Sequence, residues 1–163
     1  MTRMGVRRLS AFIFDQAAFV RGQTLKALEG VSQETAERVP APFRNSILWH
    51  AGHIYVVQER AAFVLTGLEA KLPESLTERF LFGTSPLDWT GSPPALSDIV
   101  SLLREQTERI RETLRGRLDE PSPKPYTTSS GITLTTRGEF LNFTLYHEGM
   151  HGQSIRLYKM LLQ

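Results

Sequence analysis

The chain has 163 residues, of which 40% are hydrophobic and 22% charged, a composition typical of a folded globular protein rather than a disordered one. Its 19 Lys and Arg nearly balance its 17 Asp and Glu, and a net charge of only +2 gives no support to nucleic-acid binding, which needs clustered basic residues. The chain has no cysteine, which excludes disulfides, cysteine-ligated zinc and a protein thiol nucleophile, so a transition-metal site would have to use histidine and carboxylates.

The length suits a single core, and we predict one domain over residues 1–163. Near the N-terminus, Arg7 and Arg8 precede a short apolar run that resembles a twin-arginine export signal. Asp15 cuts this run short and no small-residue cleavage site follows, so we interpret it as the first helix. No apolar run is long enough to cross a bilayer. We expect a cytoplasmic protein that does not bind membranes.

The first half of the chain predicts two helices. Apolar residues recur with a helical period over residues 9–28, and Gly30 ends the pattern. A polar linker over residues 31–42 carries two prolines and leads into a second helix at about residues 43–68. The second helix contains His50 and His53.

A long connection over residues 71–94, rich in proline, glycine and aromatic residues, is typical of a packed loop or crossover. Ser92 and Pro93 then suit the N-cap and first position of a third helix, whose apolar period continues to Leu118. Closely spaced prolines at 121, 123 and 125 end it. The Thr-rich stretch over residues 126–135 indicates an extended segment or small hairpin.

The last helix is predicted to begin near residue 137, because Thr136 and Glu139 suit a capping box, and to run almost to the end of the chain. His147 and His151 are four residues apart, so they lie on one face about 5–6 Å apart at Cβ and can share one metal ion. An apolar stripe on this face predicts that both histidines point into the core; it comprises Phe140, Phe143, Met150, Ser154, Tyr158 and Leu161.

Four amphipathic helices with two long connections predict an all-α fold, a four-helix bundle with long crossover connections. In such bundles, metal and cofactor sites form from side chains on facing helices.

The segment HEGMH also matches the HExxH pattern of zinc peptidases, in which Glu148 would be the general base. That pattern needs a third ligand. Leu157 stands where one peptidase class places a further histidine, and the twelve residues after His151 include no Asp, Glu or His. A third ligand must therefore come from upstream.

The four histidines of the chain fall into two clusters, on the inward faces of the second and last helices. This concentration favours a shared site, although two pairs of hydrogen-bonded core histidines are the alternative. His50 and His53 are only about 60° apart around their helix, so spacing does not choose between them.

Two segments, NSILWHAGHIYVVQE and FTLYHEGMHGQSIRL, resemble the DinB/YfiT-like superfamily of metal-binding four-helix bundles. In that family a WxxxH motif on the second helix supplies one histidine, and an HxxxH motif on the last helix, often continued as HxxxHxGQ, supplies two. Trp49 to His53 and His147 to Gln153 match these motifs. The resemblance therefore selects His53 over His50.

The resemblance implies a divalent metal ion, usually zinc, nickel or iron, held by His53, His147 and His151 with open positions for water or substrate. Three neutral imidazoles leave the charge of the ion uncompensated, so a bound water or thiol becomes acidic. Some relatives are transferases or isomerases that use low-molecular-weight thiols such as bacillithiol or mycothiol. The family also implies a small-molecule substrate, a thiol cosubstrate and a homodimer.

We therefore predict a metal-dependent enzyme, a thiol-dependent S-transferase or a small-molecule hydrolase. A non-catalytic, metal-stabilised binding or dimerisation bundle and an HExxH metallopeptidase are the alternatives. The candidates for a catalytic role besides the metal are Glu148, Gln153 and His50. The structural alternatives are helix orientation for Glu148 and an interhelical hydrogen bond for Gln153. His50 is either an outer partner beside the metal ligands or a helix-packing residue. Trp49 and Tyr146 are expected in the core.

Overall fold

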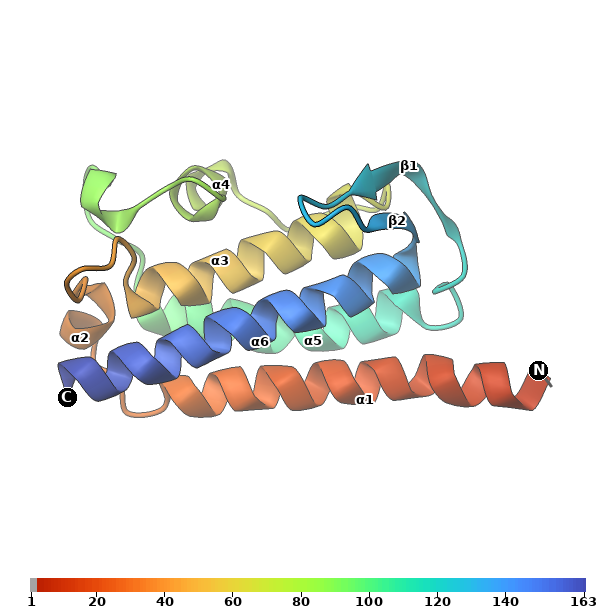
Figure 1. The fold of residues 1–163 in the computed structure, drawn as a ribbon, viewed down its shortest axis with the longest axis horizontal. Coiled ribbons are helices and arrows are strands. Elements are labelled where there is room, and N and C mark those ends of the chain that lie inside the picture. The colour runs from red at the N-terminus through yellow and green to blue at the C-terminus, as the bar shows by residue number, and fades with distance from the viewer. Residues whose placement is uncertain (1–2) are drawn as a thin grey trace.

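The computed structural model describes residues 3–163, with side chains from residue 12 onward (Figure 1). Its elements in chain order are α1 (Arg3–Leu28), α2 (Gln33–Glu37), α3 (Ile47–Glu59), the π-helical turn η1 (Arg60–Val64), α4 (Glu74–Phe80), the 3₁₀ turn η2 (Pro86–Asp88), α5 (Leu96–Leu114), β1 (Pro121–Thr127), β2 (Thr133–Thr136) and α6 (Arg137–Leu162).

The predicted all-α fold is confirmed, since the two short strands form the only sheet in the described residues. Helix α6 packs against α1 and α3, and α5 packs against the same two helices, so the four long helices lie alongside one another (Figure 1). Among the helices of residues 3–163, none combines the length and apolar composition that a membrane span requires.

Helix α3 is buried around nearly its whole circumference, with only Val57 partly exposed. A helix that is apolar on all sides is stable only where other elements cover every face. Besides α5 and α6, the short helices α2 and α4 supply this cover. Any polar side chain on α3 is therefore held inside the protein.

The start of α6 is as predicted. The Thr136 side chain accepts a hydrogen bond from the Glu139 N–H at 3.3 Å, and the Glu139 carboxylate accepts one from the Thr136 N–H at 3.0 Å. The predicted hairpin is also present, because β1 and β2 pair antiparallel with Thr127 opposite Thr133. The hairpin leads directly into the capped end of α6.

The predicted starts of α1, α3 and α5 are wrong, and α1 begins at Arg3 rather than Leu9. Helix α3 begins at Ile47 rather than Phe43. Its N-cap is Ser46, whose side chain accepts a hydrogen bond from the Trp49 N–H at 3.1 Å. Helix α5 begins at Leu96 instead of Pro93. The amide of Leu96 donates to the Gln33 side chain at 2.7 Å, so a residue of α2 caps α5 from a distance.

The long connection between α3 and α5 is packed, as expected. It contains α4, whose last residue, Phe80, is fully buried against α3. The contact depends on Gly52, since a Cβ at this position would lie 2.5 Å from the Phe80 ring. Helix α4 can therefore approach the α3 backbone closely.

The predicted inward stripe of α6 is partly wrong. Met150 and Leu161 are 45% and 63% exposed, and Tyr146, expected in the core, is 65% exposed. Because α6 packs against α1 and α3, its buried arc is rotated away from these residues. The buried residues of α6 are Arg137, Phe140, Leu141, Thr144, Leu145, Glu148, Gly152, Ile155 and Tyr158.

Candidate metal centre

Two half-buried histidines on α6 form one side of the candidate site. His147 and His151 are one helical turn apart, with ring centroids 4.5 Å apart. The helical spacing alone brings the rings together, as the sequence predicts. Both side chains are partly exposed to solvent.

Helix α3 supplies the third imidazole. One ring nitrogen from each of His53, His147 and His151 lies within 4.8 Å of the others, and His53 itself is buried. The Nε2 atoms of His53 and His147 are 3.2 Å apart. Two nitrogen ligands about 2.0–2.1 Å from a tetrahedral ion would be about 3.3–3.4 Å apart, so this spacing suits a shared metal.

The backbone orients His53. Its Nδ1 donates a hydrogen bond to the carbonyl oxygen of Phe80 at 2.6 Å, because a carbonyl can only accept. The proton on Nδ1 leaves Nε2 with a free lone pair that faces the other two histidines. Such outer hydrogen bonds typically fix the tautomer of metal-ligating histidines. No side-chain pattern in the sequence identifies the Phe80 carbonyl as the hydrogen-bond partner of His53.

Trp49 is in the core, as predicted, but it also contacts the site. Its ring stacks on His53 with centroids 4.4 Å apart and an interplanar angle of 13°. The indole N–H donates to the Thr84 hydroxyl at 2.9 Å, which holds the ring in place. Trp49 therefore keeps the His53 imidazole from rotating and covers one of its faces.

His50 is buried beside the group of three rather than within it. Its Nδ1 lies 2.8 Å from the Nδ1 of His151. The structure thus places His50 in contact with a predicted ligand from outside the cluster. This is the position of an outer partner, one of the two roles that the sequence leaves open.

All four imidazoles are neutral at neutral pH. Burial, reinforced by the neighbouring histidines, lowers the pKa of His50 and of His151 to about 3, and the pKa of His147 to about 4. Burial also lowers the pKa of His53, opposed by its hydrogen bond to Phe80. A histidine must be neutral to bind a metal ion, so the environment favours the ligating form.

Glu148 lies away from the three-histidine group, on the buried side of α6. Its carboxylate accepts hydrogen bonds from the Arg21 guanidinium at 2.7 and 3.1 Å, and both side chains are almost fully buried. Arg21 comes from α1, so Glu148 joins two helices. This arrangement matches the helix-orienting alternative and gives no support to a general base of the HExxH type.

Gln153 is exposed and makes no side-chain hydrogen bond within the described part of the chain, so neither expected role has support.

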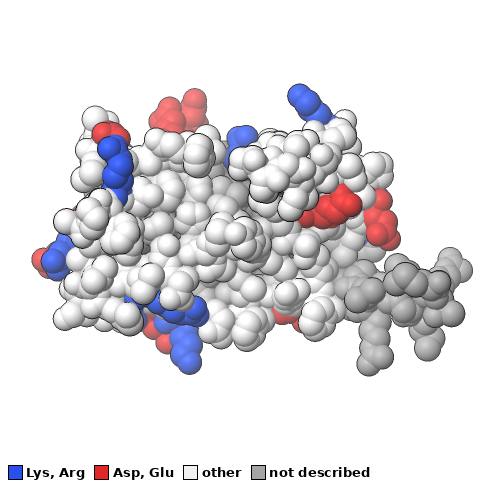
Figure 2. Space-filling model, in the orientation of Figure 1, with Lys and Arg blue, Asp and Glu red and all other residues white. Residues whose placement is uncertain are grey.

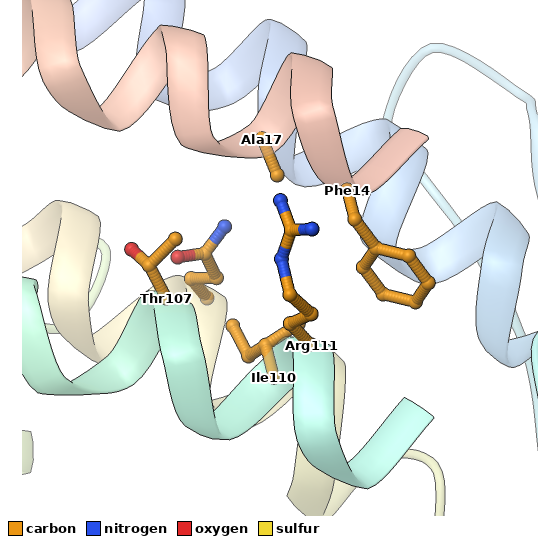
Figure 3. A pocket seen from close by; sticks show the side chains of 6 residues that line it. Phe14, Ala17, Thr107, Ile110 and Arg111 are labelled. Carbon is orange, nitrogen blue, oxygen red and sulfur yellow. The ribbon is translucent and has the colours of Figure 1, made fainter. Parts of the chain in front are cut away.

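A small pocket between α1 and α5 lies apart from the histidines (Figure 3). In this pocket the Arg111 side chain extends toward α1 near Ala17. The lining residues are Phe14, Ala17, Gln58, Thr107, Ile110 and Arg111.

The fold and the site define a class: an all-α protein in which a central helix and the last helix present three neutral imidazoles suited to a divalent metal ion. A model of the DinB superfamily matches residues 16–155, and the chain belongs to this superfamily. The resemblance carried by the two histidine motifs is thereby confirmed.

A solved structure of a conserved protein from Enterococcus faecalis is similar to this chain at 15% sequence identity. The match covers 94% of this chain and 96% of that one, with a TM-score of 0.66, and it supports the fold alone. A search of curated proteins found no match. The metal-ligating roles of the three histidines therefore stay predictions.

Proposed function

We propose that the protein is a divalent-metal-dependent enzyme whose centre is His53, His147 and His151. The observation that carries this proposal is the convergence of three neutral imidazoles, one of them held in its ligating tautomer by the Phe80 carbonyl. When bound, a divalent ion would supply Lewis acidity, which lowers the pKa of a water or thiol that joins it. Zinc, nickel and iron all suit such a donor set.

The three histidines would hold the ion from two sides. His53, buried under Trp49, would hold the ion from the core side. His147 and His151 are half-buried and would hold it at the accessible side, where a small molecule could enter. Three protein ligands leave at least one position open, which is typical of catalytic rather than structural zinc sites.

For the reaction we propose S-transfer from a low-molecular-weight thiol to a small electrophile, with small-molecule hydrolysis as the alternative. In S-transfer, the sulfur–carbon bond forms as the bond to the leaving group breaks, and the thiol proton passes to solvent. The chain has no cysteine of its own, which is consistent with an external thiol. The enzyme would act on small molecules in the cytoplasm.

The face in Figure 2 carries no cluster of basic residues of the kind that nucleic-acid binding needs. Lys and Arg side chains are scattered toward its margins, and its centre is largely uncharged. A phosphate-binding surface would need these basic residues in a cluster.

The reaction is tested by incubating zinc-, nickel- or iron-loaded protein with panels of electrophiles and small thiols, with water as sole nucleophile in parallel samples. We expect thiol-dependent loss of an electrophile that is faster than with the His147→Ala variant. The matched control is Met160→Ala, which changes an exposed residue of α6 and should keep full activity. Turnover without thiol would favour the hydrolase, and no turnover by any loaded form would favour a non-catalytic bundle.

We also propose a homodimer, as the family resemblance implies. It is supported by four exposed apolar side chains of α6 that are spaced to share one helix face: Tyr146, Met150, Leu157 and Leu161. Light scattering after size exclusion should give twice the mass of the 163-residue chain, and Met150→Glu should shift it to the monomer. A monomer at micromolar concentration would contradict this part of the proposal.

A further inference from the structure

The contact between His50 and His151 is made by the same ring nitrogen, Nδ1, of each histidine. Their Nδ1 atoms are 2.8 Å apart, a hydrogen-bonding distance. A neutral imidazole carries a proton on only one of its two nitrogens, so one ring must donate and the other accept. The contact therefore has two tautomeric arrangements.

Each arrangement has a different consequence for His151. If the Nδ1 of His50 donates, the proton of His151 is on Nε2, and that nitrogen has no lone pair for a metal. If the Nδ1 of His151 donates, its Nε2 is free to ligate. For His53 the Phe80 carbonyl settles this choice, because it can only accept. For His151 the choice depends on His50.

We propose that His50 is a positioning residue, which accepts a hydrogen bond from Nδ1–H of His151 and so presents the Nε2 of His151 to the metal ion. This inference rests on the metal centre proposed above. It assigns to His50 the function that the Phe80 carbonyl performs for His53. Outer partners of this kind fix both the tautomer and the orientation of ligating histidines.

The contact with His151 is the one hydrogen bond that the His50 side chain makes among the described residues. Its Nε2 is buried and has no hydrogen-bond partner among the described residues. The ring lies edge-to-face with Trp49 and Tyr158, at centroid distances of 5.4 and 5.1 Å. A buried polar atom without a partner costs free energy, and an apolar side chain would avoid that cost. The contact with His151 is what a polar side chain at position 50 supplies and an apolar one would not.

The same geometry argues against His50 as a fourth ligand. Its Nδ1 is occupied by the contact with His151, and its Nε2 faces buried surroundings. His50 also lies outside the group whose ligand atoms converge. It therefore acts on the metal through His151.

Two variants separate acceptance of the hydrogen bond from simple packing. His50→Asn places an amide oxygen close to the position of Nδ1 and can still accept from His151. His50→Phe fills the aromatic space but cannot accept. We expect His50→Phe to weaken zinc binding about 10- to 100-fold, as loss of an outer partner typically does, and His50→Asn to stay within a few-fold of wild type.

A second measurement needs no variant. Long-range ¹H–¹⁵N correlation spectra of the zinc-loaded wild-type chain report which ring nitrogen of each histidine carries a proton. The proposal predicts protons on the Nδ1 of His151 and the Nε2 of His50, with zinc shifting the Nε2 of His151. This result is independent of whether His50→Phe folds.

Two results would overturn the role of His50 alone: a folded His50→Phe variant that binds zinc as tightly as wild type, or a proton on the Nδ1 of His50 in the zinc-loaded chain. If the wild-type chain takes up no zinc at all, the proposed metal centre itself fails, and the role of His50 fails with it. The two failures are therefore distinguishable.

Discussion

At the scale of single residues, the sequence predicts some contacts of the histidines and not others. The i, i+4 spacing of His147 and His151 predicts their pairing, because a helix places them on one face. The choice of His53 over His50 needs the family resemblance, since both lie on inward positions of α3. The Phe80 carbonyl cannot be predicted at all, because every residue carries one and only the fold brings it to His53.

The lowered pKa values predict that the metal-free protein loses stability in acid. Unfolded histidines titrate near 6.5, whereas the folded pKa is about 4 for His147 and about 3 for His50 and His151. As the pH falls from about 6.5 toward 3–4, the unfolded chain takes up protons that the folded chain does not bind, so the free energy of unfolding decreases.

Urea unfolding of the metal-free protein at a series of pH values measures this dependence. Its stability should be greatest above pH 6.5, and the fall below that pH should be shallower in a His147→Gln variant, which has one titrating group fewer. A variant with the same slope as wild type would show that the burial of His147 does not control its protonation.

At the scale of helices, the chain's pattern predicts the four long elements but not their exact ends. Periodicity and the Thr136–Glu139 capping box place α6 correctly, because both signals are local. The start of α5 is missed because its capping partner, Gln33, lies 63 residues earlier in the chain. The exposed arc of α6 is missed because periodicity defines an apolar face without showing which neighbours cover it.

The close packing of α4 against α3 depends on a glycine of α3. A Cβ at position 52 would meet the Phe80 ring at 2.5 Å, so Gly52→Ala should displace Phe80 and lower the free energy of unfolding by about 1–3 kcal/mol. Zinc affinity should also decrease, because the Phe80 carbonyl orients His53. Chemical unfolding and zinc titration of the variant measure both effects.

The control is Gly22→Ala in α1, where nothing lies within 4 Å of the added Cβ. This helical substitution should raise stability by about 0.5–1 kcal/mol and leave zinc affinity unchanged. Equal effects of the two substitutions would contradict the close contact between α4 and α3.

At the scale of the whole molecule, one buried arginine links all four long helices. Arg21 on α1 donates to Glu148 on α6, to the Gln58 side chain on α3, and to the Leu103 carbonyl on α5. The charged side chains of Arg21 and Glu148 are both almost fully buried. Sequence spacing does not reveal this network, because its members are far apart in the chain. It explains why Glu148 belongs to the core and not to the metal centre.

Removing one partner of this pair should destabilise the protein strongly. Arg21→Met leaves the Glu148 carboxylate buried without its cation, and we expect a loss of about 3–5 kcal/mol in the free energy of unfolding. The double variant Arg21→Met/Glu148→Met leaves no buried charge and should recover much of that loss. Additive losses in the double-mutant cycle would show that the two side chains do not interact.

The central claim is that the three histidines form one metal site, and zinc titration of protein made without a histidine tag tests it most directly. We predict one ion per chain, with losses of affinity in His53→Ala and His147→Ala that exceed the about 10- to 100-fold loss expected for an outer partner, and no loss in Met160→Ala. Wild-type protein that binds no divalent ion, or variants that bind it as well as wild type, would contradict the account.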